Sequence, residues 1–152
     1  MTTPKGILLF IGSPGVGKTM LCAAVLEWCY GKFPSLRYWN ERDLMQKLRS
    51  FISSDRQGDY LKELSYTLDD YLIMIDDMGS SGMNDWRREV WLEIIDSRYE
   101  SQLPTIITSN FTLPEIKQQM GERVYSRLMS HDNTLIQMHG FKDMRQEVPN
   151  GN

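Results

Sequence analysis

Cysteine, histidine and long apolar runs are scarce in this chain of 152 residues. Two cysteines do not make a disulfide scaffold, and two histidines without partners at ligand spacing argue against a histidine-based metal site. No apolar run approaches the roughly 20 residues that a membrane-spanning helix requires, and "MTTPKG" lacks the pattern of a signal peptide. These absences exclude a disulfide-rich secreted domain and a membrane protein.

An excess of positive charge is also missing. The formal net charge is -3, so a protein whose whole surface binds nucleic acid is excluded, and any DNA contact must come from a local basic patch. Cys22 and Cys29 lie on similar faces of one predicted helix, so we expect no disulfide between them and a reduced, cytoplasmic setting. With 41% hydrophobic residues, the chain suits a single domain over residues 1–152.

Strands alternate with helices along the chain. Short apolar runs predict strands at 6–12, 35–40, 71–79, 104–110 and 134–140. Helical spacing predicts helices at 17–31, 41–53, 60–68 and 86–101 and one or two within 112–130, with a loop at 54–59 and Thr112 as a helix cap. This alternation is typical of an α/β three-layer sandwich with a five-stranded parallel sheet, whose sites lie at the carboxyl ends of the strands.

The segment "GSPGVGKT", residues 12–19, follows the first strand and opens the first helix. It matches in full the G-x-x-x-x-G-K-[ST] pattern, in which loop amides cradle phosphates. Lys18 is then expected to reach the β- and γ-phosphates, and the Thr19 hydroxyl to bind Mg2+. A plain strand-to-helix turn needs glycine but does not need Lys18 and Thr19 at these places. The loop therefore predicts nucleotide binding.

Two acids end the third predicted strand, in "YLIMIDDMG". Successive strand residues face opposite ways, so Asp76 and Asp77 are expected to have different roles. We expect Asp76 to hold Mg2+ beside Thr19, and Asp77 to orient or activate the attacking water. The alternative is a solvated turn after the strand. On the next strand, "PTIITSN" ends with Asn110, which is placed to bond the γ-phosphate or the water.

Taken together, these segments resemble the AAA+ ATPases, and more narrowly the DnaC/IstB group of helicase loaders. The matching pieces are "KGILLFIGSPGVGKTML", "YLIMIDDMG", "TIITSN", "GERVYSRLMS" and "MHGFKDMR". The resemblance implies strand order 5-1-4-3-2, oligomers with ATP or ADP at subunit interfaces, Asn110 as sensor 1, Arg127 as an arginine finger and Arg145 as sensor 2. The implied nucleotide-binding residues are Gly12, Ser13, Pro14, Gly15, Val16, Gly17, Lys18, Thr19, Met20 and Arg145.

The chain departs from that pattern in two ways. The acidic pair is Asp-Asp where these ATPases usually have Asp-Glu, so Asp77 is one methylene shorter and slow turnover is expected. The sequence also starts directly at the first strand. The N-terminal segment by which loaders bind the replicative helicase, and a helical lid after the last strand, are therefore expected to be absent from this ATPase core.

The arginine assignment has an alternative. Arg123 and Arg127 are four residues apart and lie near one another on a helix. Either one is a candidate finger, and the resemblance favours Arg127. A solvated helix face with an acid partner such as Glu122 would place arginines there as well.

A basic and aromatic stretch at 47–62 is the local candidate for single-stranded DNA. Its cations are interleaved with Phe51 and Tyr60, which is the composition of single-strand binding surfaces, and initiator-type AAA+ proteins carry a DNA-contacting helix here. Asp55, Asp59 and Glu63 dilute the charge, so an ordinary helix and loop is an equal alternative. The cations are Lys47, Arg49, Arg56 and Lys62.

Three functions follow from the resemblance. The first is an Mg2+-dependent ATPase of a helicase loader, which self-assembles and regulates loading of the replicative helicase onto single-stranded DNA. The second is a transposition-accessory ATPase of the IstB type, and the third is an ATP-dependent binding switch with little turnover. A small-molecule kinase is disfavoured, because no basic lid or acceptor pocket is evident in the sequence.

Overall fold

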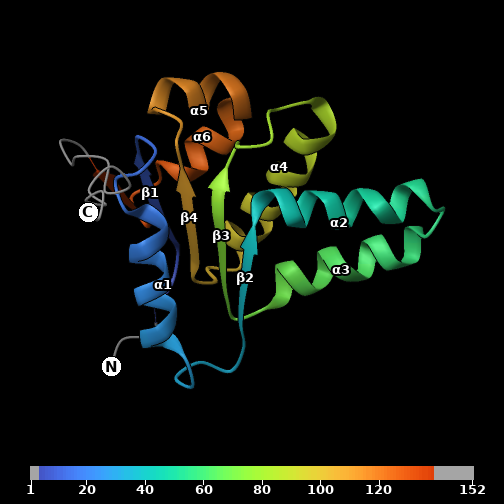
Figure 1. The fold of residues 1–152 in the computed structure, drawn as a ribbon, viewed down its shortest axis with the longest axis horizontal. Helices are drawn as coiled ribbons and strands as arrows, with labels where there is room; N and C mark the ends of the chain where they lie inside the picture. Colours follow the sequence, from blue (N-terminus) through green and yellow to red (C-terminus); the bar gives the residue numbers. More distant parts are fainter. Residues whose placement is uncertain (1–3, 139–152) are drawn as a thin grey trace, which may run out of the picture.

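The computed structural model describes residues 4–138. Five strands are connected by six helices along this part of the chain, with one or two helices between successive strands (Figure 1). The strands are β1 (Ile7–Gly12), β2 (Leu36–Asn40), β3 (Leu72–Met78), β4 (Thr105–Ser109) and β5 (Thr134–Met138). The helices are α1 (Lys18–Cys29), α2 (Glu41–Ser53), α3 (Gln57–Asp69), α4 (Asp85–Glu100), α5 (Leu113–Met120) and α6 (Glu122–Leu128).

All strand pairs in the sheet are parallel, and the strand order is β2-β3-β4-β1-β5. Read from the other edge, this is the predicted order 5-1-4-3-2, so the fold class is confirmed. Because β1 lies between β4 and β5, its carboxyl end stands beside that of β4, and the end of β3 comes next. The phosphate loop and the acidic strand end are therefore neighbours.

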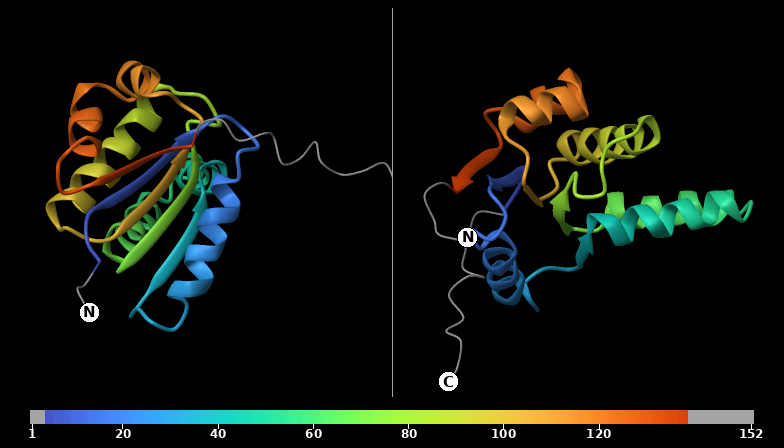
Figure 2. Two further views of the ribbon diagram at one scale, coloured as in Figure 1. Left: turned by 90° about the vertical axis from the view of Figure 1, so that its left-hand side faces the viewer. Right: turned by 45° about the horizontal axis from the view of Figure 1, so that its top comes forward.

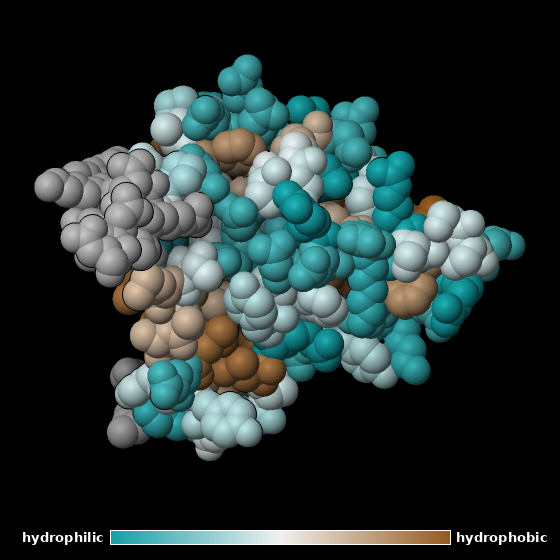
Figure 3. Space-filling model, viewed as in Figure 1, coloured by the Kyte–Doolittle hydropathy of each residue, from teal (hydrophilic) through white to brown (hydrophobic). Residues whose placement is uncertain are grey.

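The two faces of the sheet are covered unequally (Figure 2). One face packs on α2 to α6 and holds the larger core, to which Ile7, Leu9 and Ile11 of β1 contribute. The intervening Phe10 points to the opposite face, where α1 provides the cover through Cys22 and Cys29. Apolar residues gather beside α1 on the surface seen in Figure 3. The alternation of strand side chains thus produces three layers, as predicted.

Both cysteines are free and buried in this smaller core, as expected from their spacing. Burial raises the pKa of Cys22 to about 12, with the nearby Asp76 carboxylate acting in the same direction. Within residues 4–138, no helix is long and apolar enough to cross a membrane.

The predicted loop at 54–59 is only partly a loop. Helix α3 begins at Gln57, and the amides of Asp59 and Tyr60 already donate to the Arg56 carbonyl. Gly58 suggested a turn, since glycine costs about 1 kcal/mol relative to alanine within a helix. Packing of Leu64 in the core and an Arg56–Asp59 ion pair offset that cost. The result is an α2–α3 hairpin that projects beyond the sheet (Figure 1).

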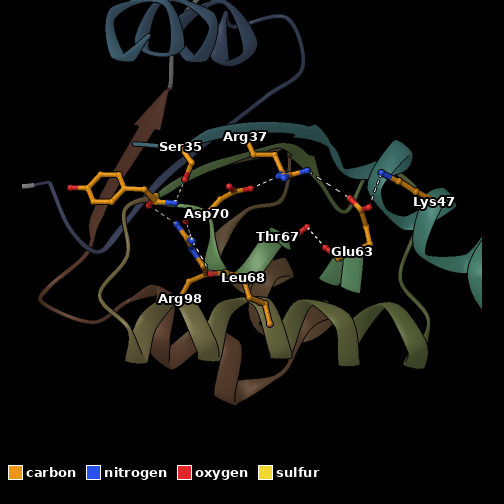
Figure 4. Close-up of polar contacts among 9 residues, drawn as sticks. Ser35, Arg37, Lys47, Glu63, Thr67, Leu68, Asp70 and Arg98 are labelled. Atoms are coloured by element: carbon orange, nitrogen blue, oxygen red, sulfur yellow. Dashed lines mark hydrogen bonds and ion pairs between the residues drawn. The ribbon is translucent and has the colours of Figure 1, made fainter. Parts of the chain in front are cut away.

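The amino ends of β3 and β4 are joined by a buried arginine that the sequence analysis did not single out (Figure 4). Arg98 of α4 is 0% exposed, and burial lowers its pKa to about 10. Its guanidinium also donates to the Thr105 hydroxyl. The carbonyls that accept from it are those of Leu68, Asp70, Tyr71 and Pro104. These contacts lie at the amino ends of the strands, whereas the predicted site lies at their carboxyl ends.

Candidate nucleotide-binding site

A cavity of about 280 Å³ lies over the carboxyl ends of β1, β3 and β4. Its walls combine the phosphate loop, the acidic strand end and Asn110, so the structure brings together segments far apart in the sequence. The lining residues are Pro14, Gly15, Gly17, Lys18, Thr19, Met20, Asp76, Asp77, Thr108 and Asn110. Of these, Thr108 was not assigned a role of its own from the sequence.

The loop between β1 and α1 has the backbone that a phosphate cradle needs. Gly15 and Gly17 have φ angles of 82° and 92°, a left-handed conformation that L-residues rarely adopt. Gly17 is the N-cap of α1, and no side chain caps the helix there. An anion near the first amides of α1, at the positive end of the helix dipole, is therefore favoured.

Lys18 is the first residue of α1 and only 6% exposed. Its ammonium donates to the carbonyls of Gly12 and Ser13 at 2.8 and 2.9 Å, and to the Asn110 side-chain oxygen at 2.7 Å. These three acceptors hold the Lys18 ammonium over the loop. The bonds are of the charge-assisted type that a phosphate oxygen can replace.

Thr19 and Asp76 meet as predicted. The Thr19 hydroxyl donates to the two carboxylate oxygens of Asp76 at 3.0 and 3.2 Å. The Thr108 hydroxyl donates to the same carboxylate at 2.5 Å, and the Tyr38 hydroxyl lies 3.4 Å from it. A hydroxyl and a carboxylate oxygen in contact are suitable ligands for Mg2+, which coordinates oxygen and is usually completed by phosphates and water.

Tyr38 was missed by the sequence analysis. It lies on β2, which pairs with β3 and places Asn40 opposite Asp76. Burial raises the pKa of the Tyr38 hydroxyl, and the Asp76 carboxylate adds to the increase, so this hydroxyl is a donor at neutral pH. The alternating pattern of β2 was the available signal, because Tyr38 and Asn40 share one strand face.

The acidic pair does not follow simple alternation. Asp77 has a φ of 67°, and the β3–β4 register is irregular between Ile75 and Met78. The expectation that the two acids face opposite ways is therefore wrong, because both line the same cavity. They still have different partners: the Asn110 amide donates to Asp77 at 2.7 Å, whereas Thr19 and Thr108 contact Asp76.

The Asp77 backbone is fixed by its neighbour strand. Its amide donates to the Thr108 hydroxyl at 2.7 Å, while that hydroxyl donates to Asp76. One threonine thus holds both acids. A continuous chain also runs from Lys18 through Asn110 to Asp77, so the predicted phosphate-binding, sensor and catalytic residues contact one another directly.

Arg127 lies outside this cavity lining. Its guanidinium contacts Asp96 of α4 through Nε, and Arg123 contacts the other oxygen of the same carboxylate. The suggested acid partner Glu122 instead binds Lys117 at 2.9 Å. That partner assignment is wrong because Asp96 projects from α4 toward α6. Arg145 lies outside the described residues.

The basic stretch at 47–62 is partly neutralised. Lys47 binds Glu63 at 2.8 Å and lies 5.1 Å above the Trp39 ring. Arg56 binds Asp59, and its guanidinium lies 5.4 Å above the Phe51 ring. The hairpin therefore carries cations next to aromatic rings, with acids alongside them, as its composition predicted.

Comparison with known proteins fixes the family. A family model described as IstB-like ATP binding protein matches residues 2–145. The chain belongs to this family. The lysine, threonine, aspartate and asparagine cluster described above is thus found in an ATP-binding family, in agreement with the nucleotide site predicted from the loop.

Relatives of this IstB-like chain include replicative helicase loaders and a putative ATP-binding protein of an insertion sequence. It is 30% identical over 125 residues to the replicative helicase loader DnaI of Bacillus subtilis, covering 78% of this chain and 39% of the relative. It is 28% identical over 142 residues to the replicative helicase loader DnaC of Escherichia coli K12, covering 92% of this chain and 56% of the relative. It is 28% identical over 125 residues to the IS5376 putative ATP-binding protein of Geobacillus stearothermophilus, covering 82% and 48%.

Solved structures agree with the fold. The DnaC helicase loader superposes with a TM-score of 0.76 at 31% identity, covering 90% of this chain and 81% of that one. AMPPCP-bound DnaA from Aquifex aeolicus also superposes with a TM-score of 0.76, covering 93% of this chain and 43% of that one. Its sequence identity is only 17%, so this likeness shows the shared AAA+ fold alone. Against the curated relatives above, the IstB-like chain spans 39% to 56% of their length.

Proposed function

We propose that this chain is the ATP-hydrolysing AAA+ core of a helicase loader, and that its self-assembly with ATP regulates loading of a replicative helicase onto single-stranded DNA. The observation that carries the proposal is the contact chain Lys18–Asn110–Asp77 beside the Thr19–Asp76 pair. The residues proposed to bind phosphate, to bind metal and to orient water thus line one cavity.

Binding would use the loop and Lys18. The amides at the start of α1 and the Lys18 ammonium would hold the phosphates of ATP, and Met20 would line the nucleotide beside them. Thr19 and Asp76 would hold Mg2+, which neutralises charge on the phosphates when bound. Within residues 4–138 no group of three or more His, Cys, Asp or Glu could hold a metal. The phosphates of the nucleotide, together with water, would supply the remaining ligands.

Hydrolysis would use Asp77 and Asn110. The Asp77 carboxylate would orient the attacking water, and the Asn110 amide would hold that carboxylate or contact the γ-phosphate. Asp77 is shorter than the glutamate usual in this position, which supports slow turnover. If the rate is close to zero while ATP binds, the same site would act as an ATP-dependent binding switch.

A neighbouring copy would complete the site. Arg127 lies outside its own protomer's cavity lining, which fits a finger that acts on ATP bound by another copy in a homo-oligomer. An arginine supplied in this way can accelerate phosphoryl transfer about 10³-fold or more. Arg145 is proposed as the sensor 2 residue.

The proposed partner follows from the kinds of protein that the chain resembles. Two of the relatives described are replicative helicase loaders, which favours a replicative helicase as partner. The insertion-sequence ATP-binding protein is the observation behind the second candidate, a transposition-accessory ATPase. Single-stranded DNA is proposed to contact the α2–α3 hairpin at Lys47, Arg49, Arg56 and Lys62. The two free, buried cysteines support a reduced cytoplasmic location.

The proposal is tested by ATP turnover per protomer as a function of protein concentration, with and without single-stranded DNA. A rate that rises with concentration and responds to DNA is expected. A flat rate near zero despite ATP binding would contradict the loader ATPase and favour an ATP-dependent binding switch. A lack of ATP binding would overturn the proposed nucleotide site.

A further inference from the structure

Asp96 lies on the inner side of α4, facing α6. Its side chain is 15% exposed, and its two carboxylate oxygens contact Arg127 and Arg123. A charge shielded from water interacts more strongly with its partner than one at the surface. The contact between Asp96 and Arg127, which is itself 25% exposed, is therefore more than a screened surface pair.

The contact leaves part of the guanidinium available. The Asp96 carboxylate forms an ion pair with Nε of Arg127 that lacks hydrogen-bond geometry, and Glu100 lies 3.8 Å from Nη2, beyond hydrogen-bond distance. The terminal nitrogens are the atoms with which arginine binds phosphate in a bidentate manner. The Tyr99 ring lies 5.3 Å from the guanidinium carbon, so the group is oriented from a second side.

The backbone of Arg127 is also fixed. Asn133 donates from its amide nitrogen to the Arg127 carbonyl at 2.6 Å, while its side-chain oxygen accepts from the Ile7 amide at 2.7 Å. The end of α6 is thus tied to the start of β1, the strand that leads into the phosphate loop. Main chain and side chain of Arg127 are held independently.

Attachment of α6 to the domain does not depend on Asp96. Val124 and Leu128 are 1% and 2% exposed and belong to the large core, together with Ile94 and Ile95 of α4. These apolar contacts account for the docking of α6. The charged contact beside them acts on the position of the arginine side chains.

We propose that Asp96 is a positioning residue for Arg127: it holds the guanidinium through Nε and directs the terminal nitrogens toward the phosphates of ATP bound by a neighbouring copy of this chain. The inference rests on the proposed function, in which Arg127 acts in trans. Arginine side chains have many rotamers, and fixing one before assembly removes that entropy cost from the step that uses it.

The test compares Asp96→Asn with Glu93→Gln, a control at an exposed carboxylate on the same helix. We expect Asp96→Asn to lower kcat by about tenfold to a hundredfold, in the range that misplacement of a catalytic group costs, with unchanged KM and a small decrease in Tm, because a partly shielded ion pair is lost. Glu93→Gln should leave kcat and KM unchanged. Asp96→Asn combined with Arg127→Ala should be no slower than Arg127→Ala alone.

Mixed oligomers give the second readout. An Asp77→Asn protomer keeps an intact Arg127, so adding it to Asp96→Asn protomers should restore turnover. Independent, multiplicative effects of the Asp96 and Arg127 changes, or an unchanged kcat in Asp96→Asn, would overturn the positioning role. If Arg127→Ala itself keeps the full rate, the trans-acting finger of the proposed function fails instead.

Discussion

Replacing Lys18 by alanine removes the only cation that lines the described cavity, and the structure sets the size of the effect. Three acceptors surround its ammonium at 2.7 to 2.9 Å. In the ATP complex, phosphate oxygens would take over such bonds. A hydrogen bond to a charged group contributes about 1.5–3 kcal/mol, so ATP affinity should fall about tenfold to a hundredfold.

Stability should change much less than affinity in the Lys18→Ala variant. The Gly12 and Ser13 carbonyls lose a donor, but both residues line a neighbouring cavity of about 300 Å³, in which water can replace it. Calorimetric titration with ATP measures the affinity, and thermal unfolding of the free protein measures stability. Lys32→Ala, at an exposed lysine above Trp28, is the matched control. A change in ATP Kd below twofold would refute the phosphate-binding role of Lys18.

Three further changes address the rest of the site and the fold. Asp77→Asn should keep ATP binding within a few-fold and reduce turnover at least about a hundredfold in a single-turnover assay; an unchanged rate would remove Asp77 from the mechanism. Asp76→Asn should raise the Mg2+ concentration needed for half-maximal ATP binding about tenfold or more, since a ligand charge is lost; an unaltered Mg2+ titration would contradict the metal role. Arg98→Met leaves four carbonyls and the Thr105 hydroxyl without their donor, and each unsatisfied group costs about 1–3 kcal/mol. The domain should therefore fail to fold or unfold at a much lower temperature in a melting experiment, and an unchanged Tm would show that the contact is dispensable.

The sheet and the phosphate loop could be predicted because their signals are local. Short runs that end in glycine predicted β1, β3 and β5, and short runs that end in asparagine predicted β2 and β4. The pattern around Lys18 needs only consecutive residues. Thr112 was likewise expected as a cap, and it forms a capping box with Glu115 at the start of α5. In each case the residues that determine the structure lie within one turn or one strand.

The parts that were missed depend on partners distant in the sequence. Asp96 and Arg98 look like ordinary charged positions on an amphipathic helix. Nothing in "IIDSRYE" reveals that Asp96 faces α6, or that Arg98 faces the carbonyls just before β3 and β4. The left-handed backbone of Asp77 departs from the alternation that a sequence pattern assumes. Tyr38 reaches Asp76 only because β2 and β3 pair in a particular register.

The place of β1 in the sheet has a consequence for protein synthesis. β1 is made first, yet its partners β4 and β5 are made last among the described strands. Contacts so distant in sequence form only after long loops have closed, whereas the β3–α4–β4 unit can pair as it emerges. The phosphate loop at the end of β1 therefore gains its final geometry only after β4 and β5 have been made. In such a protein, the ability to hold nucleotide is acquired at the end of folding, and it reports that the whole domain has been assembled.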